Sequence, residues 1–275
     1  LINAVKQLLF VFVNFTRFSR LILKNDFKII HIISCTGNGF WRNGIFILLA
    51  KLKSIKSIFH VVGEIDVFWS TSGFFKKKLI KFFLDISDKI IVQSEGIRSK
   101  VKLMTKTHIV SIINGVDTNI YNPTNKLSKD NVNELCLVTV GVLGNRKGYN
   151  DLIDLASILV ESNISDIKFR FIGGGEVSLY KSIIKEKNLE GIIKIFDNIS
   201  NEEKISLLKS SDVFVLPTYN EGQPISIIEA FCCGLPIIST NVGAIPEIIN
   251  EKSGFLLNPG DLAKLKGIIL KLYKE

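Results

Sequence analysis

Apolar residues in the first half of the chain alternate between two periods. Short runs rich in Ile, Val and Phe indicate strands, and longer segments with apolar residues three to four positions apart indicate helices. The expected strands are 28–34, 56–62, 88–93 and 108–113. The expected helices are 1–23, 41–52, 73–87 and one that Ser94 caps and that ends near Met104. This alternation is typical of a parallel sheet with helices on both faces.

The second half repeats the pattern after a polar segment, 114–133, that contains Pro123 and several Asn. The expected strands are 134–140, 167–172, 192–196, 213–216, 236–240 and 255–257. The expected helices are 149–162, 177–188, 201–210, 224–233 and 245–250. The sequence therefore predicts an α/β fold of two Rossmann-like domains, 1–120 and 134–275, with ligands in a cleft at the carboxyl ends of the strands.

One connection between a strand and a helix carries two carboxylates eight residues apart, Glu221 and Glu229. Gly222 permits a backbone turn, and Pro224 suits the first helical position. The backbone N–H groups from Ile225 onward are free at the helix start, which favours a phosphate there. A bound diphosphate would leave one carboxylate near the group on each side of it. This arrangement predicts a nucleotide-sugar site.

A second loop offers cations for the same diphosphate. Arg146 and Lys147 follow a strand and lie between Gly144 and Gly148. Two cations at the carboxyl end of a strand can neutralise a diphosphate leaving group. The alternative is a solvated basic turn with no ligand.

Several short segments in a fixed order carry a resemblance to a known family. The carboxylate pair 221–229 is followed by Ala-Phe-Cys-Cys-Gly-Leu-Pro, residues 230–236. The other segments are Asn-Gly-Val-Asp at 114–117, Val-Gly at 140–141, Arg-Lys-Gly at 146–148, Phe-Ile-Gly-Gly-Gly-Glu at 171–176, 241–247 and 258–261. Together they resemble retaining glycosyltransferases of the GT-B fold, most closely glycosyltransferase family 4, the group 1 glycosyltransferases. The resemblance is strong from about residue 88 to residue 261.

The resemblance implies roles for these residues. It places Glu221 beside the donor sugar, where a carboxylate stabilises positive charge at the anomeric carbon. It implies that Glu229 binds the ribose hydroxyls and that Lys147, with Arg146, holds the diphosphate. The remaining expected donor-binding residues are Gly222, Gln223, Pro224, Ile225, Gly174 and Asn198. Val142 departs from the family, which often has Arg directly after the glycine of Val-Gly.

The acceptor side is expected in the first domain. Glu64 and Asp66 follow a strand, where they could contact sugar or acceptor hydroxyls. His60 shares a strand face with Val62 and is expected to be a core or sheet-face residue. Comparison with the family predicts a truncated first domain that lacks its first strand, and a second domain that lacks its final crossing helix.

The resemblance implies glycosyl transfer with retention, in which the leaving diphosphate helps to deprotonate the acceptor. No Asp-x-Asp occurs in the chain, so we expect neither a metal nor another cofactor. Two alternatives stay open. One is a GT-B sugar-nucleotide epimerase, and the other is a catalytically weak scaffold that binds nucleotide-sugar or a partner transferase.

Charge is distributed unevenly along the chain. Residues 1–130 hold 20 Lys and Arg against 8 Asp and Glu, a net charge of +12, whereas residues 131–275 hold 15 and 18, a net charge of −3. This asymmetry suggests an anionic partner for the first half. No nucleic-acid-binding motif is present, so an anionic membrane surface is the better candidate.

The predicted helix 73–87 is the expected membrane contact because it combines aromatic residues with lysines. The lysines are Lys76, Lys77, Lys78 and Lys81. The alternative is an ordinary surface helix. No stretch reads as a membrane span, and the four cysteines show no zinc or disulfide spacing, which fits the cytoplasm. We expect a peripheral enzyme on the inner face of the membrane. Its acceptor would be a lipid-linked saccharide of lipopolysaccharide or another surface polysaccharide.

Overall fold

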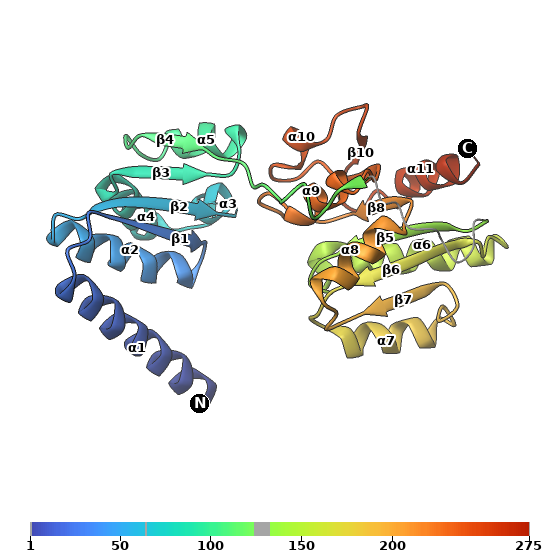
Figure 1. Cartoon of the computed structure of the whole chain (residues 1–275), viewed down its shortest axis with the longest axis horizontal. Helices are drawn as coiled ribbons and strands as arrows, with labels where there is room; N and C mark the ends of the chain where they lie inside the picture. Colours follow the sequence, from blue (N-terminus) through green and yellow to red (C-terminus); the bar gives the residue numbers. More distant parts are fainter. Residues whose placement is uncertain (1, 64, 124–132, 275) are drawn as a thin grey trace. The chain divides into compact units, whose positions relative to one another are not determined.

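The protein is described here by a computed structural model, which covers residues 2–63, 65–123 and 133–274 and the side chains from residue 12 onward. These residues form two compact units, Leu1–Ile113 and Asn114–Glu275 (Figure 1). Each unit is built around one sheet, and every described strand pair is parallel. The predicted α/β class is confirmed.

The first unit contains a four-stranded sheet. Its strands are β1 (Ile29–Cys35), β2 (Lys56–Val62), β3 (Lys89–Val92) and β4 (Ile109–Ser111), which lie in that order. Its helices are α1 (Ile2–Lys24), α2 (Asn38–Leu52), α3 (Ile65–Ser70), α4 (Phe74–Ile86) and α5 (Glu95–Lys102). Ser94 caps α5 as predicted, because its hydroxyl accepts a hydrogen bond of 3.1 Å from the Ile97 N–H. Only α3 was not predicted, since six residues are too few to show a helical period.

The helices of the first unit cover one face of its sheet. Consecutive strands are spatial neighbours, so right-handed connections place all their helices on the same side. That face buries Phe59 of β2 against Ile47 of α2 and Phe83 of α4. The opposite face carries His31 and Ile33, and Ile33 is 62% exposed. The prediction of helices on both faces is therefore wrong for the described part of this unit.

The second unit contains a six-stranded sheet in the order β10-β9-β8-β5-β6-β7. Its strands are β5 (Leu135–Val140), β6 (Ile167–Ile172), β7 (Ile193–Phe196), β8 (Val213–Leu216), β9 (Ile237–Thr240) and β10 (Gly254–Leu257). Its helices are α6 (Tyr149–Glu161), α7 (Val177–Glu186), α8 (Asn201–Lys209), α9 (Ile225–Cys232), α10 (Ile245–Ile248), α11 (Leu262–Lys274) and the short 3-10 helix η2 (Asn145–Lys147). The strands and helices predicted here are all present, and η2 and α11 are additions.

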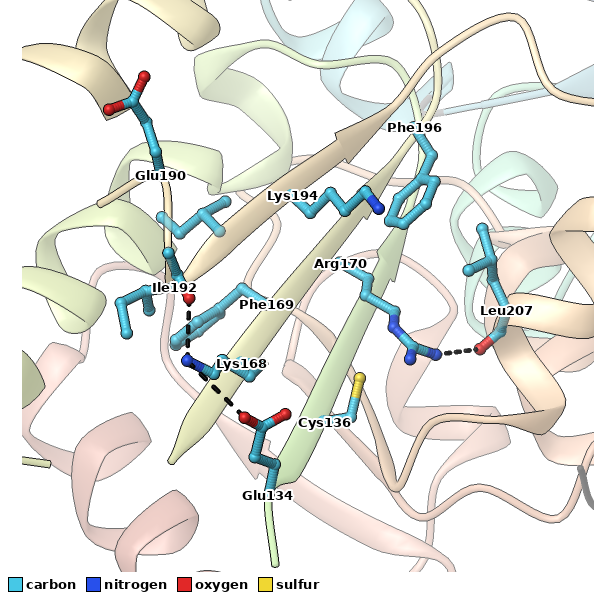
Figure 2. A pocket seen from close by; sticks show the side chains of 12 residues that line it. Glu134, Cys136, Lys168, Phe169, Arg170, Glu190, Ile192, Lys194, Phe196 and Leu207 are labelled. Carbon is cyan, nitrogen blue, oxygen red and sulfur yellow. Dashed lines mark hydrogen bonds and ion pairs between the residues drawn. The ribbon is translucent and has the colours of Figure 1, made fainter. Parts of the chain in front are cut away.

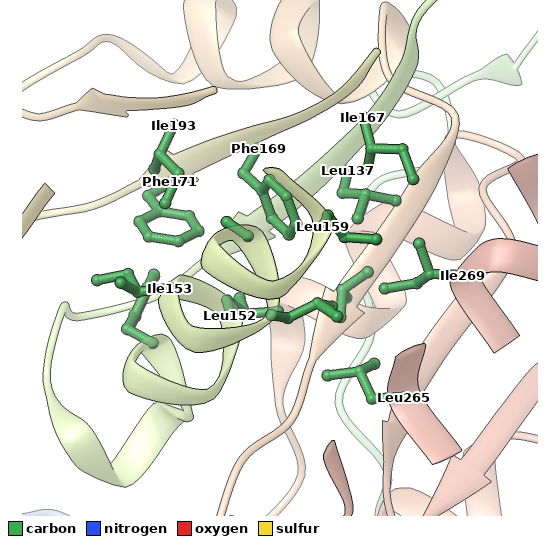
Figure 3. Packing of buried hydrophobic residues seen from close by; sticks show 14 of the residues in the cluster. Leu137, Leu152, Ile153, Leu159, Ile167, Phe169, Phe171, Ile193, Leu265 and Ile269 are labelled. Carbon is green, nitrogen blue, oxygen red and sulfur yellow. The ribbon is translucent and has the colours of Figure 1, made fainter. Parts of the chain in front are cut away.

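The strand order of the second sheet reverses at β5, so both faces are covered. Helices α6, α7 and α11 pack on one face and α8, α9 and α10 on the other. Figure 3 shows the first of these layers, in which Phe169 of β6 lies over Leu159 of α6 and Ile269 of α11 completes the cluster. Burial of one such side chain contributes about 1.5–3 kcal/mol. The reversal creates a switch point between β5 and β8, where ligands bind in open α/β sheets.

Candidate active site

The loops that follow β5 and β8 meet at the switch point. Both loops leave the carboxyl ends of neighbouring parallel strands. The carbonyl of Arg146 accepts hydrogen bonds from the Tyr219 N–H at 2.9 Å and from the Thr218 hydroxyl at 3.0 Å. Residues more than 70 positions apart in the sequence are thereby held together.

These loops bring the predicted cations and one predicted carboxylate together. Lys147 donates from Nζ to Oε1 of Glu221, whose side chain is only 9% exposed. The Thr218 hydroxyl lies 3.2 Å from the same oxygen, so its one hydrogen is shared between Glu221 and the carbonyl of Arg146. Arg146 lies farther out, with its guanidinium 3.9 Å from that oxygen and its side chain 55% exposed, and it also donates to the carbonyl of Asn220. The site is thus a buried ion pair with a second, solvent-facing cation beside it.

The backbone of Glu221 is held by a glycine from another loop. Gly243 has a φ of +56°, and a Cβ atom at this position would lie 1.9 Å from the carbonyl oxygen of Glu221. The next residue, Ala244, donates its N–H to the carbonyl of Gly222 at 2.8 Å. Only glycine permits this approach, because it lacks a Cβ and adopts positive φ freely. The loop after β9 therefore fixes the position of the carboxylate.

The residues between the two carboxylates form the start of α9. Pro224 is the N-cap, with φ −71° and ψ 116°, and the helix begins at Ile225, so the prediction that Pro224 occupies the first helical position is wrong by one residue. Gln223 is buried and accepts two hydrogen bonds from Asn114. Its side-chain oxygen accepts from the backbone N–H of Asn114, and its backbone carbonyl accepts from Nδ2 of Asn114 at 3.0 Å. Ile225 is exposed.

The second carboxylate, Glu229, forms a separate buried cluster on α9. Its side chain is 10% exposed, and its Oε1 accepts hydrogen bonds from Nζ of Lys204 and from the hydroxyl of Tyr121, both at 2.7 Å. Burial lowers the pKa of Lys204, but the hydrogen bonds to Glu229 and Tyr121 outweigh it, and the pKa lies above its ordinary value. Burial, followed by the hydrogen bond to Glu229, raises the pKa of Tyr121. Neither partner was predicted from the sequence.

A groove at the ends of β5, β6 and β7 contains the remaining predicted residues. It is lined by Gly141, Val142, Gly173, Gly174, Asn198 and Lys204, among others. The structure therefore brings Gly174 and Asn198 together, as the nucleotide prediction requires, and places Lys204 between the groove and Glu229. Gly173 has a φ of +144° and approaches the carbonyl of Gly141 so closely that any Cβ would lie 2.0 Å from it.

A second groove begins at the amino ends of β5 and β6, away from these loops (Figure 2). Its cations already have partners. Lys168 donates to the carbonyl of Gly191 at 2.9 Å, and Arg170 donates to the hydroxyl of Ser210 at 2.7 Å. The ammonium group of Lys194 lies 5.1 Å from the centroid of the Phe196 ring. Because these charges are satisfied within the fold, we assign no ligand to this groove.

The predicted acceptor-side residues belong to the first unit. Glu64 lies outside the described residues, and Asp66 lies in the first turn of α3, where it accepts a hydrogen bond of 2.6 Å from Lys100. His60 is a sheet-face residue stacked on His31 at 5.5 Å, and neither ring nitrogen has a hydrogen-bond partner among the described residues. Burial, with a smaller contribution from the charge of His31, lowers its pKa.

Helix α4 has features of an ordinary surface helix and features of a membrane contact. It buries Ile80, Phe83 and Leu84 in the core. It also exposes aromatic side chains, among which Phe75 is 83% exposed, and Lys78 lies 4.5 Å from the Phe74 ring centroid. Lys81 pairs with Asp85 at 2.9 Å. Within the part of the chain that the structure describes, no helix is long and apolar enough to cross a membrane, and no group of metal-ligating residues is found.

Comparison with known proteins identifies the family. The chain is 32% identical over 160 residues to the sulfoquinovosyl transferase of Arabidopsis thaliana, covering 54% of this chain and 30% of that protein. It is 31% identical over 146 residues to the amylovoran biosynthesis glycosyltransferase AmsK of Erwinia amylovora, covering 50% of this chain and 36% of that protein. The chain thus spans about a third of the length of these two relatives.

Solved structures support the fold. The Anabaena protein HepE in complex with UDP matches with a TM-score of 0.75 and 16% identity, covering 94% of this chain and 72% of that one. This likeness is consistent with the predicted GT-B fold and, at this identity, concerns the fold alone. The sequence profile of the group 1 glycosyl transferases matches residues 124–275, which is more than half of the chain. The chain therefore belongs to the group 1 glycosyl transferases.

Proposed function

We propose that the protein is a retaining glycosyltransferase that moves a sugar from a nucleotide-sugar to a saccharide or lipid-linked acceptor. The observation that carries this proposal is the contact between Lys147 and Glu221 beside the start of α9, with Glu229 one turn farther along the same helix. A cation, a helix start and two buried carboxylates suit the diphosphate, the sugar and the ribose of one donor.

Each part of the donor has a place in this arrangement. The groove that contains Gly174 and Asn198 would take the base, and Glu229 would accept hydrogen bonds from the ribose hydroxyls. The diphosphate would lie at the start of α9, near Lys147 and Arg146. Glu221 would then face the donor sugar. Val142 is uncharged, so the two cations of η2, Arg146 and Lys147, would compensate the negative charge of the diphosphate.

The transfer step follows from these positions. The bond between the anomeric carbon and the diphosphate oxygen breaks, and a bond to the acceptor oxygen forms on the same face of the sugar. The acceptor proton passes to the departing diphosphate oxygen. Lys147 and Arg146 stabilise the charge that develops on the diphosphate, while Glu221 stabilises the positive anomeric carbon. We propose that the reaction proceeds without a metal.

The configuration of the product tests this proposal. A nucleotide-sugar with an α-linked sugar should give an α-linked product, which NMR of the anomeric proton identifies. A β-linked product would contradict retention. Release of an altered nucleotide-sugar without any acceptor would instead indicate an epimerase, and donor binding without turnover would indicate a scaffold.

We also propose that the enzyme works at an anionic membrane, on the cytoplasmic face, in the synthesis of a bacterial surface polysaccharide. Support comes from the exposed aromatic side chains and lysines of α4 and from the net charge of +12 over residues 1–130. Similarity to an amylovoran biosynthesis enzyme fits this role. Each lysine near such a surface contributes about 1 kcal/mol, and aromatic side chains insert at the headgroup level.

Sedimentation with anionic vesicles tests the membrane contact. The variant changes Lys76, Lys77, Lys78 and Lys81 to Glu. The matched control changes four exposed lysines of the second unit to Glu, namely Lys185, Lys252, Lys264 and Lys274. The α4 variant should lose binding while the control keeps it, and added salt should weaken binding of the wild type. Equal sedimentation of both variants would exclude α4 as the contact.

A further inference from the structure

The hydrogen bonds of Glu229 are unevenly divided between its two oxygens. Oε1 accepts from both Lys204 and Tyr121, at 2.7 Å each. Among the described residues, no group donates to Oε2. A carboxylate oxygen has two lone-pair sites, so Oε1 is saturated and Oε2 remains available. The cluster therefore presents one defined acceptor atom rather than a freely rotating carboxylate.

The two donors come from different parts of the second unit. Lys204 lies in the second turn of α8, and its ammonium group also lies 5.5 Å from the ring centroid of Tyr121. Tyr121 is buried and belongs to the polar segment that begins at Asn114. Two independent elements thus converge on one carboxylate of α9, which fixes its rotamer from two sides.

Lys204 also lines the groove that contains Gly174 and Asn198. Its ammonium group therefore stands at the boundary between that groove and the carboxylate. A buried carboxylate without a cationic partner favours its protonated form, and protonation converts an acceptor oxygen into a donor. Lys204 supplies the cationic partner of Glu229.

We infer that Lys204 and Tyr121 are positioning residues that hold the carboxylate of Glu229 in one orientation, so that its Oε2 selects a ribonucleoside diphosphate over the 2′-deoxy form. This inference rests on the proposed function, because it assumes that the groove holds a nucleotide. Neither residue needs to touch the reacting atoms. Their effect should appear in the selectivity for the ribose and in the pH dependence of that selectivity.

The surroundings of Glu229 set the pH range of the test. The titratable groups near it are Lys204, Tyr121 and Cys233, and burial raises the pKa of Cys233 to about 11. The pKa values of Lys204 and Tyr121 are also raised above their ordinary values. None of these three groups changes charge between pH 5.5 and 8.0, whereas the terminal phosphate of a nucleoside diphosphate does, with a second pKa of about 6. The quantity that should stay nearly constant in wild type is therefore the ratio of the affinities for the ribose and deoxy forms.

The experiment is calorimetric titration with UDP, GDP and ADP and with their 2′-deoxy counterparts. For its best ligand, wild type should prefer the ribose form about tenfold at both pH 5.5 and pH 8.0, the scale of one hydrogen bond to a charged group. Lys204→Met should lose this preference at pH 5.5 and recover part of it at pH 8.0, with the ribose and deoxy forms compared at the same pH. Its affinity for the deoxy form should change little. The control Lys209→Met, at the end of the same helix, should resemble wild type.

Three results would overturn the inference. If wild type binds a nucleoside diphosphate but Lys204→Met keeps the same preference and pH profile, the positioning role is wrong and the donor site stands. If wild type binds the deoxy form equally well, the selection by Oε2 is wrong. If wild type binds no nucleoside diphosphate, the proposed function fails and this inference with it. Should Lys204→Met melt below the assay temperature, Tyr121→Phe supplies the same readout with a smaller expected loss in preference, about threefold.

Discussion

Replacement of Gly243 by alanine tests whether the loop after β9 fixes the position of Glu221. At a φ of +56°, alanine is disfavoured by about 1–2 kcal/mol relative to glycine. The new Cβ would lie 1.9 Å from the carbonyl oxygen of Glu221, so the two backbones must separate. Separation breaks the hydrogen bond of 2.8 Å from Ala244 to Gly222, which contributes about 1 kcal/mol.

The expected loss in the free energy of unfolding is therefore about 2–3 kcal/mol. In a domain of this size, 1 kcal/mol shifts the Tm by about 2–4 °C, so the Tm should fall by about 4–12 °C. The transfer rate should fall by more than the loss of folded protein explains. A displacement of about 1 Å in a catalytic group can lower the rate about a hundredfold. Differential scanning calorimetry measures the first effect and initial-rate assays below the Tm measure the second.

Gly191→Ala is the matched control, since a Cβ at Gly191 meets no atom within 4 Å. This variant should stay within about 0.5 kcal/mol of wild type and keep its transfer rate. If Gly243→Ala melts and reacts like Gly191→Ala, the close contact between the two loops does not hold Glu221, and the reasoning is wrong.

Three further predictions concern the charges of the chain. Glu221→Gln and Lys147→Ala should each lower the transfer rate about a hundredfold. The control removes the exposed Lys187, which pairs with Asp154, and should keep the wild-type rate. Full activity in the Glu221 or the Lys147 variant would remove that residue from the site. Transfer in excess EDTA should equal transfer without it, and rescue of a lost activity by Mn²⁺ or Mg²⁺ would show that a metal takes part. Burial and the charge of His31 lower the pKa of His60. The unfolded chain therefore binds more protons than the folded chain below about pH 6.5. The contribution of His60 to stability should be full above that pH and should be lost as the pH falls through the folded pKa. His60→Phe should remove this part of the decline in Tm, and an unchanged pH profile would show that His60 is not its source.

The meeting of the two loops of the candidate site could be predicted from the sequence because it follows from strand order. Once β5 and β8 are neighbours, the loops that follow them must meet, and Lys147 then lies beside Glu221. The segment 241–247 was noted only as part of the family resemblance. The close approach of Gly243 to Glu221 depends on a φ angle that no hydrophobic pattern contains.

Other features could not be predicted, for identifiable physical reasons. Lys204 lies on a short, mostly polar helix, where one lysine resembles any other until α8 is packed against the sheet. Tyr121 belongs to a polar segment without periodicity, so nothing indicates that its hydroxyl reaches Glu229, 108 positions away. One face of the first sheet is left uncovered by the described residues, and this follows from the order β1-β2-β3-β4, which the alternation of helices and strands does not specify.

A thermal-shift panel tests the central claim, that the switch-point loops of the second unit form a nucleotide-sugar site. Wild type and a Glu221→Gln, Glu229→Gln double variant would be melted with UDP-, GDP-, ADP- and dTDP-linked sugars at increasing concentration. At least one donor should raise the Tm of wild type with a dependence on concentration that follows mass action. At a hundredfold excess over Kd, the gain in the free energy of unfolding should be about 2.7 kcal/mol. The same donor should stabilise the double variant far less. If no donor stabilises wild type, or if the double variant is stabilised equally, the site is not where we place it.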